Sequence, residues 1–161
     1  MAIKAGDSLP LDLKLKEMGE GGPKDVTVGD VFNGKKVVLF AVPGAFTPTC
    51  SMKHLPGFLE QAAAIRAKGV DEIVCLSVND AFVMGAWGKA NSAAGKVRML
   101  ADGNGDFTKA IGLELDASGF GMGTRSQRYA LIVNNGKVQE ALVEPGPGLN
   151  VSSAESVLSK L

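Results

Sequence analysis

The chain has 161 residues, of which 45% are hydrophobic and 21% charged, with 17 basic residues balanced by 17 acidic ones. This length predicts a single domain over residues 1–161 with a sizeable core. The charge balance argues against nucleic acid and anionic membranes as partners, and no apolar run has the roughly 18 residues of a membrane span. Two cysteines are too few for a disulfide scaffold, which favours a reducing intracellular compartment.

Strand-like and helix-like patterns alternate along the chain. A continuous apolar run predicts a buried strand at 35–42, and apolar residues at helical spacing predict a helix over 50–68 that ends at Gly69. The further expected elements are a strand at 72–78, a helix at 79–90 capped by Asn79 or Asp80, a strand at 97–100, a helix at 106–113, a hairpin over 128–143 with its turn at Asn135-Gly136, and a helix at 152–161. This order predicts an α/β protein with a mixed sheet and helices on both faces.

The stretch PGAFTPTCS (43–51) joins the first predicted strand to the following helix. Pro43 ends the strand because it has no N–H for the ladder. Thr47 suits the N-cap, and Pro48 stands at the first helical position, where proline is tolerated best. Cys50 then falls in the first turn of the helix, near unpaired amides and the positive end of the helix dipole. This setting favours a thiolate over a thiol.

The helix alone does not account for a thiolate at neutral pH. Lowering a thiol pKa from about 8.5 to about 6 takes roughly 3.4 kcal/mol, whereas a helix N-terminus supplies about 0.3–1 kcal/mol and at most about 2. A cation is therefore required. Lys53 and His54 are near in sequence, but an arginine from elsewhere in the fold is better, because it stays charged and offers a fork of donors.

Several residues also have a purely structural interpretation. A cysteine is often a small buried hydrophobe, and this reading suits Cys75, which lies within a predicted strand, better than Cys50. His54, the one histidine, tunes the thiolate or is simply packed or solvated. The segment 102–107 resembles the start of a calcium loop but lacks the required glycine and glutamate, so we interpret it as a turn. The glycine-rich segment 119–123 lacks the context of a dinucleotide loop and is interpreted as a flexible loop.

The motif PGAFTPTC resembles the peroxiredoxin signature P-x-x-x-T-x-x-C. With LSVNDAFVMGAWGK and RSQRYALIV, the longer stretch VPGAFTPTCSMKHLPGF resembles the type II, peroxiredoxin-five-like branch of plants and algae. The resemblance implies a thioredoxin-like fold and reduction of hydrogen peroxide and alkyl hydroperoxides through a cysteine sulfenic acid, without a metal or organic cofactor.

The same resemblance implies the roles of individual residues. Cys50 matches the peroxidatic cysteine, Thr47 the threonine whose hydroxyl holds the peroxide, and Pro43 the proline that shields the site. The arginine of the family is best matched by Arg128, with Arg125 as the second choice. Donors from Arg128, Thr47 and the start of the helix would stabilise the charge that builds on the departing oxygen.

The regenerating thiol is where the chain departs from part of this family. Members with a C-terminal resolving cysteine have it where this chain has Val151. Cys75 is the remaining internal candidate, and its predicted strand would have to unfold locally to reach Cys50. We therefore expect an external thiol, glutaredoxin with glutathione or thioredoxin, and a Cys50–Cys75 bond as the lesser alternative. The resemblance also implies a homodimer, with the 79–90 helix at its interface, and a location in the chloroplast after removal of a transit peptide or in the cytoplasm.

Three other functions are weighed against this one. A disulfide oxidoreductase requires C-x-x-C, and TPTC has Thr47 at the first cysteine position. A copper-handling protein requires paired cysteines and a distant histidine, which this chain lacks. A binding or chaperone domain on the same fold is harder to exclude, because fold does not fix function. Such a domain would not need Thr47, Cys50 and Arg128 together.

Overall fold

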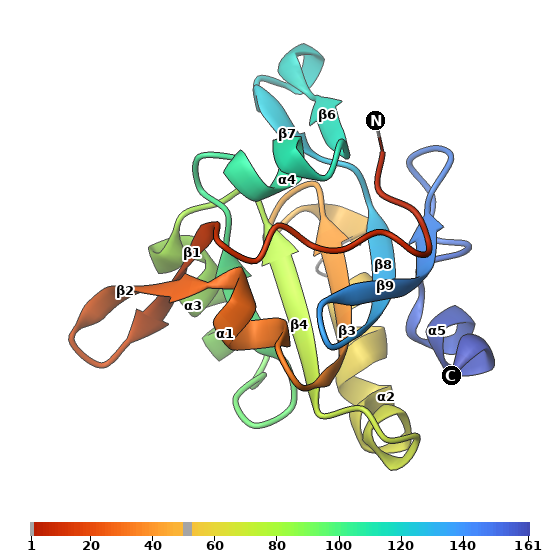
Figure 1. The fold of residues 1–161 in the computed structure, drawn as a ribbon. Helices are drawn as coiled ribbons and strands as arrows, with labels where there is room; N and C mark the ends of the chain where they lie inside the picture. Colours follow the sequence, from red (N-terminus) through yellow and green to blue (C-terminus); the bar gives the residue numbers. More distant parts are fainter. Residues whose placement is uncertain (1, 50–52) are drawn as a thin grey trace.

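A mixed β-sheet runs through the centre of the computed structural model, which describes residues 2–49 and 53–161 (Figure 1). Its strands lie in the order β2-β1-β5-β4-β3-β8-β9. They are β1 (Lys14–Gly19), β2 (Gly22–Thr27), β3 (Lys36–Val42), β4 (Glu72–Ser77), β5 (Arg98–Ala101), β8 (Tyr129–Asn134) and β9 (Lys137–Val143). The central strands β3, β4 and β5 are parallel, and the outer strands are antiparallel to their neighbours. Two shorter strands, β6 (Glu114–Asp116) and β7 (Thr124–Ser126), form a separate hairpin that projects from the sheet.

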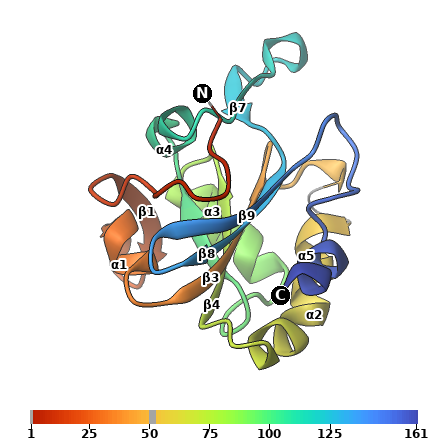
Figure 2. The same ribbon diagram turned by 45° about the vertical axis from the view of Figure 1, so that its right-hand side comes forward.

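Helices cover both faces of the sheet (Figure 2). The helices α1 (Val28–Phe32) and α4 (Asp106–Ala110) lie on one face, and α2 (Leu55–Ala67), α3 (Ala81–Ala90) and α5 (Ala154–Lys160) on the other. Successive side chains of a strand point to opposite faces. Accordingly Val37 and Leu39 of β3 pack with α1 and α4, while Val38 and Phe40 pack with α2 and α3. The predicted α/β sandwich is confirmed.

The elements predicted from strong apolar patterns are all present, with ends shifted by a few residues. The Asn135-Gly136 turn has positive φ at both residues, 50° and 78°, as a tight hairpin turn of this type requires. Asp80, one of the two cap candidates, caps α3 by accepting a hydrogen bond from the Val83 N–H at 2.8 Å. The β1–β2 hairpin, α1 and the β6–β7 hairpin were not predicted. The 119–123 segment lies in the loop of the last of these hairpins and overlaps a short 3₁₀ turn, η2 (Ser118–Phe120).

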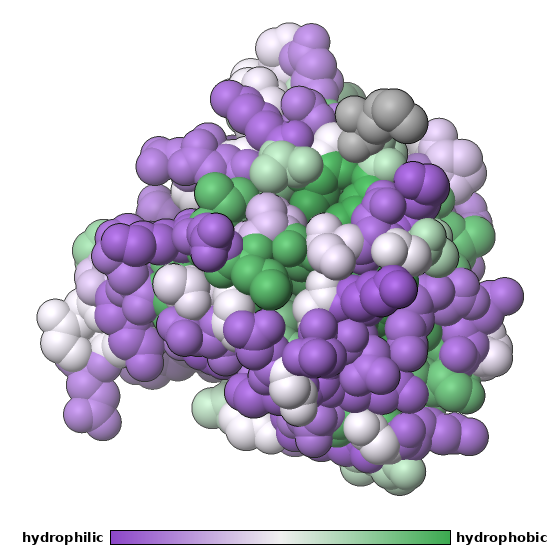
Figure 3. Space-filling view, viewed as in Figure 1, coloured by the Kyte–Doolittle hydropathy of each residue, from purple (hydrophilic) through white to green (hydrophobic). Residues whose placement is uncertain are grey.

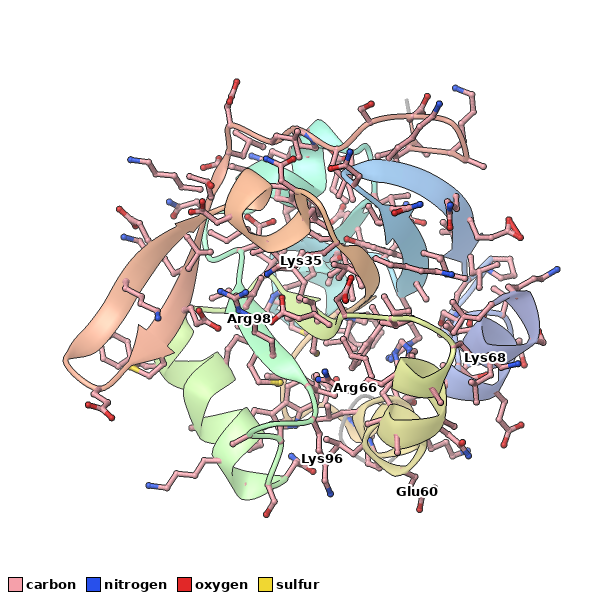
Figure 4. All side chains as sticks on the ribbon, turned by 60° about the horizontal axis from the view of Figure 1, so that its bottom comes forward. Lys35, Glu60, Arg66, Lys68, Lys96 and Arg98 are labelled. Carbon is pink, nitrogen blue, oxygen red and sulfur yellow. The ribbon has the colours of Figure 1, made fainter. Side chains whose placement is uncertain are left out.

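Ion pairs tie together the end of the sheet where the parallel strands begin (Figure 4). The Arg98 guanidinium donates to Glu17 at 2.8 Å and to Glu72 at 3.2 Å. The hydrogen bond to Glu17 is the main reason that the pKa of Arg98 is raised above its ordinary value. Arg66 of α2 donates to the carbonyl oxygens of Asp71 and Lys96, each at 3.1 Å. The basic side chains labelled in Figure 4 thus lie at the end opposite the carboxyl termini of β3 and β4.

The face shown in Figure 3 is largely hydrophilic, with hydrophobic residues gathered near its middle. Among the residues that the structure describes, no helix has the length and apolar character required to cross a membrane.

Candidate active site

The turn that follows β3 carries most of the residues singled out from the sequence. Pro43 ends the strand, and helical backbone begins at Pro48, directly after Thr47, as predicted. The Thr47 hydroxyl donates to the Gly44 carbonyl at 2.7 Å, so its oxygen keeps lone pairs that can accept a hydrogen bond. Cys50, the predicted reactive cysteine, lies outside the described residues. In sequence it directly follows Thr49, which is part of the pocket described below.

The neighbouring strand β4 holds this turn in place. Asn79, two residues beyond the end of β4, accepts a hydrogen bond from the Ala45 N–H at 3.0 Å. Ser77, the last residue of β4, donates its hydroxyl to the Val42 carbonyl at 3.2 Å. Asn79 was considered only as a helix cap, because sequence alone does not show that it faces a turn 34 residues away.

Gly44 lets the turn pack tightly. A Cβ atom at this position would lie 3.0 Å from Thr47 Cγ2, 3.2 Å from Met122 Cε and 3.3 Å from an Arg125 guanidinium nitrogen. Arg125 itself donates to the carbonyl oxygens of Met122 and Pro43, at 3.0 Å and 3.5 Å. Arg125, the second-choice arginine, therefore stabilises the turn after β3 from its position in β7.

Arg128 directly precedes β8 and is 7% exposed. It lines the same pocket as Pro43 and Thr47, a cavity of about 580 Å³. The apolar wall of this pocket comes from the β6–β7 hairpin and from the loop after β9, and it consists of Leu115, Ala117, Phe120, Met122, Pro145 and Pro147. Two predicted residues of the motif, Pro43 and Thr47, thus meet the permanently charged guanidinium of Arg128 in one pocket that has an apolar wall.

His54 is packed inside the protein, 1% exposed, and both ring nitrogens have partners. Its Nδ1 lies 2.9 Å from Arg128 Nη1, and its Nε2 lies 2.9 Å from the Ser152 carbonyl oxygen. Burial lowers the pKa of the imidazole to about 3; the nearby Arg128 charge adds to this, and the Ser152 carbonyl opposes it. His54 is neutral at physiological pH, and its contact with Arg128 was not predicted.

Glu144 is another buried residue of the site that sequence reasoning missed; it is 5% exposed and lines the pocket. Its Oε2 accepts hydrogen bonds from the N–H groups of Asn150, Val151 and Ser152 and from the Ser152 hydroxyl, at 2.7–2.9 Å. Burial acts to raise the pKa of this carboxyl, but the hydrogen bonds from Ser152 and the neighbouring amides outweigh it and hold the pKa below its ordinary value. Its one sequence signal is an acidic residue between a predicted strand and the loop PGPGLN (145–150).

Cys75 lies in the interior of the central sheet rather than at the pocket. It is fully buried in β4, opposite Phe40 of β3 and Met99 of β5. This is the structural burial that the sequence suggested. In the described part of the chain, no group of three or more His, Cys, Asp or Glu side chains is arranged to hold a metal ion.

The comparisons with known proteins are extensive. The Redoxin family matches residues 4–158. The chain is similar to peroxiredoxin-2C of Oryza sativa subsp. japonica, with 51% identity over 160 residues, 99% of this chain and 98% of that protein. It is 48% identical to the chloroplastic peroxiredoxin-2E of Arabidopsis thaliana over 99% of this chain and 70% of that protein. Its structure resembles that of reduced Prx3 from Vibrio vulnificus in complex with hydrogen peroxide, with a TM-score of 0.93, 52% identity and 98% coverage of each chain.

Proposed function

This chain belongs to the peroxiredoxins, in their type II branch with its thioredoxin-like fold, and is a thiol-dependent peroxidase; from this premise we propose that it reduces hydrogen peroxide and alkyl hydroperoxides at Cys50. The observation that carries this proposal is the meeting of Pro43, Thr47 and Arg128 in one pocket that Thr49, the neighbour of Cys50, also lines. The antioxidant role follows from the chemistry, because each turnover removes one hydroperoxide.

In the proposed first step the Cys50 thiolate attacks the terminal oxygen of the peroxide. The O–O bond breaks, its electron pair goes to the departing oxygen, and the sulfur becomes a sulfenic acid. The departing alkoxide or hydroxide takes up a proton and leaves as alcohol or water. The Arg128 guanidinium serves as a fixed donor to the charge that develops on oxygen. The Thr47 hydroxyl, whose proton is donated to the Gly44 carbonyl, serves as an acceptor for the O–H of the peroxide. The guanidinium also favours the thiolate before reaction.

The pocket supports alkyl hydroperoxides as substrates beside hydrogen peroxide. Its polar groups, the Arg128 guanidinium as donor and the Thr47 hydroxyl oxygen as acceptor, are suited to the peroxide group. Its wall of Leu115, Phe120 and Met122 is suited to an apolar chain. A volume of about 580 Å³ is larger than hydrogen peroxide alone requires. No metal or organic cofactor enters the proposed reaction.

We further propose that an external thiol regenerates the enzyme. A first thiol attacks the sulfenic acid to give a mixed disulfide and water, and a second thiol releases the Cys50 thiolate. Glutaredoxin with glutathione, or thioredoxin, is the proposed donor. The supporting observation is the burial of Cys75 in the central sheet, where it is 0% exposed, together with Val151 at the position where some relatives have a resolving cysteine.

The assembly and location of the protein are also proposals. We propose a homodimer of one-domain subunits, residues 1–161, and this is supported by two exposed phenyl rings near α3, Phe46 at 54% and Phe82 at 65%. The chloroplast or the cytoplasm is the proposed location, and one relative is named chloroplastic.

A peroxide-consumption assay with a thiol donor tests the function. Cys50→Ser is expected to lower the rate by at least about 10³-fold, because a serine hydroxyl does not ionise near pH 7. Cys75→Ser is the matched control, since it removes the other sulfur and is expected to keep most of the rate. Equal rates for wild type and Cys50→Ser would contradict the proposal. Running the assay with glutathione–glutaredoxin and with thioredoxin identifies the donor.

Mass spectrometry after one equivalent of peroxide tests the route of regeneration. Without added thiol we expect Cys50 sulfenic acid, which is trapped by dimedone. With glutathione we expect a mixed disulfide that is about 305 Da heavier than the reduced protein. A dominant loss of about 2 Da, from a Cys50–Cys75 bond, would contradict the external-thiol route.

A further inference from the structure

The hydrogen bonds around His54 fix its protonation state by donor and acceptor chemistry alone. A guanidinium has only N–H donors, so His54 Nδ1, 2.9 Å from Arg128 Nη1, must be the acceptor and carry no proton. A carbonyl oxygen only accepts, so His54 Nε2, 2.9 Å from the Ser152 oxygen, must carry the proton and donate it. One neutral tautomer satisfies both contacts, and the low pKa of the ring agrees with it.

The ring plane of His54 is fixed as well. The imidazole packs against Phe40 of β3 with a centroid distance of 4.9 Å and against Phe58 of α2 at 5.6 Å. These two phenyl rings stack on each other at 4.0 Å and are fully buried. The histidine therefore meets Arg128 from a dry and closely packed position, where rotation about its χ angles is restricted.

The contacts run from Arg128 through His54 to Ser152, and Glu144 holds Ser152 in place. Its Oε2 accepts from the Ser152 N–H at 2.8 Å and from the Ser152 hydroxyl at 2.7 Å, so the carbonyl that receives the His54 proton belongs to a clamped segment. The Glu144 N–H also donates to the Arg128 carbonyl at 3.0 Å. Arg128 and Glu144 are thus joined through the backbone on one side and through Ser152 and His54 on the other.

We propose that His54 is a positioning residue for the reaction: its Nδ1 holds the Arg128 guanidinium at the pocket, and the Glu144–Ser152 clamp holds His54. An arginine side chain loses rotamer entropy when it is fixed in one place, so holding it before substrate arrives removes that cost from the reaction. This inference rests on the proposed role of Arg128 at the peroxide.

The choice of a neutral partner has a chemical reason. A carboxylate in direct contact with the guanidinium would offset much of its positive charge. A neutral imidazole accepts the hydrogen bond without adding a negative charge, so the full charge of Arg128 stays available to the Cys50 thiolate and to the departing oxygen. The negative charge in this network, on Glu144, is bonded to the 150–152 segment instead.

Two substitutions of His54 separate its two contacts. In His54→Asn the amide oxygen is attached to Cγ, as Nδ1 is, and can accept from Arg128. In His54→Gln the amide is one bond farther out, level with Nε2, and can donate to Ser152 but has no acceptor at the position of Nδ1. We expect His54→Gln to lower kcat/KM for peroxide by about 10-fold to 10²-fold, as a misplaced catalytic group does. His54→Asn is expected to keep most of the wild-type kcat/KM, although both variants are expected to be less stable than the wild type.

A second measurement distinguishes a loss of positioning of Arg128 from a general loss of folded structure. The pH dependence of Cys50 alkylation, measured with Cys75→Ser in the background, is expected to move to a higher pKa in His54→Gln and to stay near the wild-type pKa in His54→Asn. Equal losses of kcat/KM in the two variants, or no loss in His54→Gln, would overturn the proposal.

Arg128→Lys distinguishes a failure of this proposal from a failure of the proposed role of Arg128, on which it rests. If Arg128→Lys keeps the wild-type rate, the role of Arg128 fails; if it loses rate while His54→Gln does not, only the positioning by His54 fails.

The wild-type protein provides a test that needs no variant to fold. Because His54 is the one histidine of the chain, its two ring nitrogens can be assigned without ambiguity by ¹⁵N NMR. We expect Nε2 protonated and Nδ1 unprotonated from pH 7 down to pH 5. An imidazole that titrates near its ordinary pKa of about 6.5, or that carries its proton on Nδ1, would overturn the proposal.

Discussion

At the scale of single residues, the site depends on side chains that contact it from distant parts of the chain. Pro43 and Thr47 belong with Cys50 to the PGAFTPTC signature, whose local chemistry is visible in the sequence, and Arg128 follows from the family pattern. His54 and Asn79 act through partners that are distant in the chain: His54 contacts Arg128, 74 residues away, and Ser152, 98 residues away. Single-sequence reasoning about spacing cannot pair such residues, because the sheet topology brings them together.

The buried histidine leads to a prediction about stability and pH. The unfolded chain takes up a proton on His54 below about pH 6.5, whereas the folded protein does not until about pH 3. Because the pKa of His54 is lower in the folded protein than in the unfolded chain, its contribution to the free energy of unfolding is fully present above pH 6.5. This contribution decreases as the pH falls toward 3. The free energy of unfolding of the wild type, measured with urea, is expected to fall by up to about 1.4 kcal/mol per pH unit between pH 6.5 and 5 because of this group.

His54→Asn is the comparison for this stability prediction, because asparagine does not titrate. Its unfolding free energy is expected to be lower at pH 7 and to change less with pH across the same window. Glu144 does not confuse the comparison, since its pKa is held below the ordinary carboxyl value and it titrates at lower pH. Parallel curves for the two proteins would contradict the buried neutral histidine.

At the scale of elements, the strength of the apolar signal decided what could be predicted. The strands β3 and β4 are buried on both faces and read as continuous apolar runs. The strands β1 and β2, of which β2 forms the edge of the sheet, each bury a single residue, Leu15 and Val26. The three residues of β6 are all exposed, so neither hairpin has a comparable apolar pattern. The helix α1 has only five residues and forms with the help of a capping box between Thr27 and Asp30, a short T-x-x-D pattern that by itself does not predict a helix.

The turn between β3 and the helical residue Pro48 gives a prediction at this scale. Gly44→Ala is expected to lower peroxidase activity by about 10-fold or more, because the new methyl group at 3.0 Å from Thr47 Cγ2 and 3.3 Å from Arg125 displaces the turn. Gly57→Ala is the matched control: it lies inside α2, where an added Cβ meets nothing within 4 Å. That change is expected to keep the rate and raise stability by about 0.5–1 kcal/mol. Steady-state kinetics and urea unfolding check both variants.

At the scale of the whole molecule, composition and element order were enough to predict the layered architecture, because a buried parallel sheet needs helices on both faces. Composition and element order do not reveal which outer surface would form the interface of the proposed homodimer. The structure adds one observation on this point: Phe46 is held at a φ of 63°, unusual for a bulky residue, and its ring lies 6.3 Å from that of Trp87 in α3. Phe82, at the start of the same helix, is 65% exposed.

A charge at this surface tests the proposed homodimer. Phe82→Lys is expected to shift the protein from dimer to monomer in sedimentation velocity, because an interface that buries an aromatic ring does not accommodate an unpaired ammonium. Phe120→Lys, at a ring 86% exposed on the β6–β7 hairpin, is the control and is expected to leave the association unchanged. A dimer that withstands Phe82→Lys, or dissociates equally with Phe120→Lys, would contradict an interface at α3.

The separate β6–β7 hairpin has a consequence for how this enzyme can diversify. Leu115, Phe120 and Met122 belong to that projection, whereas Arg128 and Thr47 stand at the ends of sheet strands or next to them. If the proposed function holds, sequence drift, insertions or deletions in the projection would change which hydroperoxides fit. The turn after β3 that carries Thr47 and the segment before β8 that carries Arg128 would remain as they are. Specificity and reactivity are therefore free to evolve on separate pieces of the same fold.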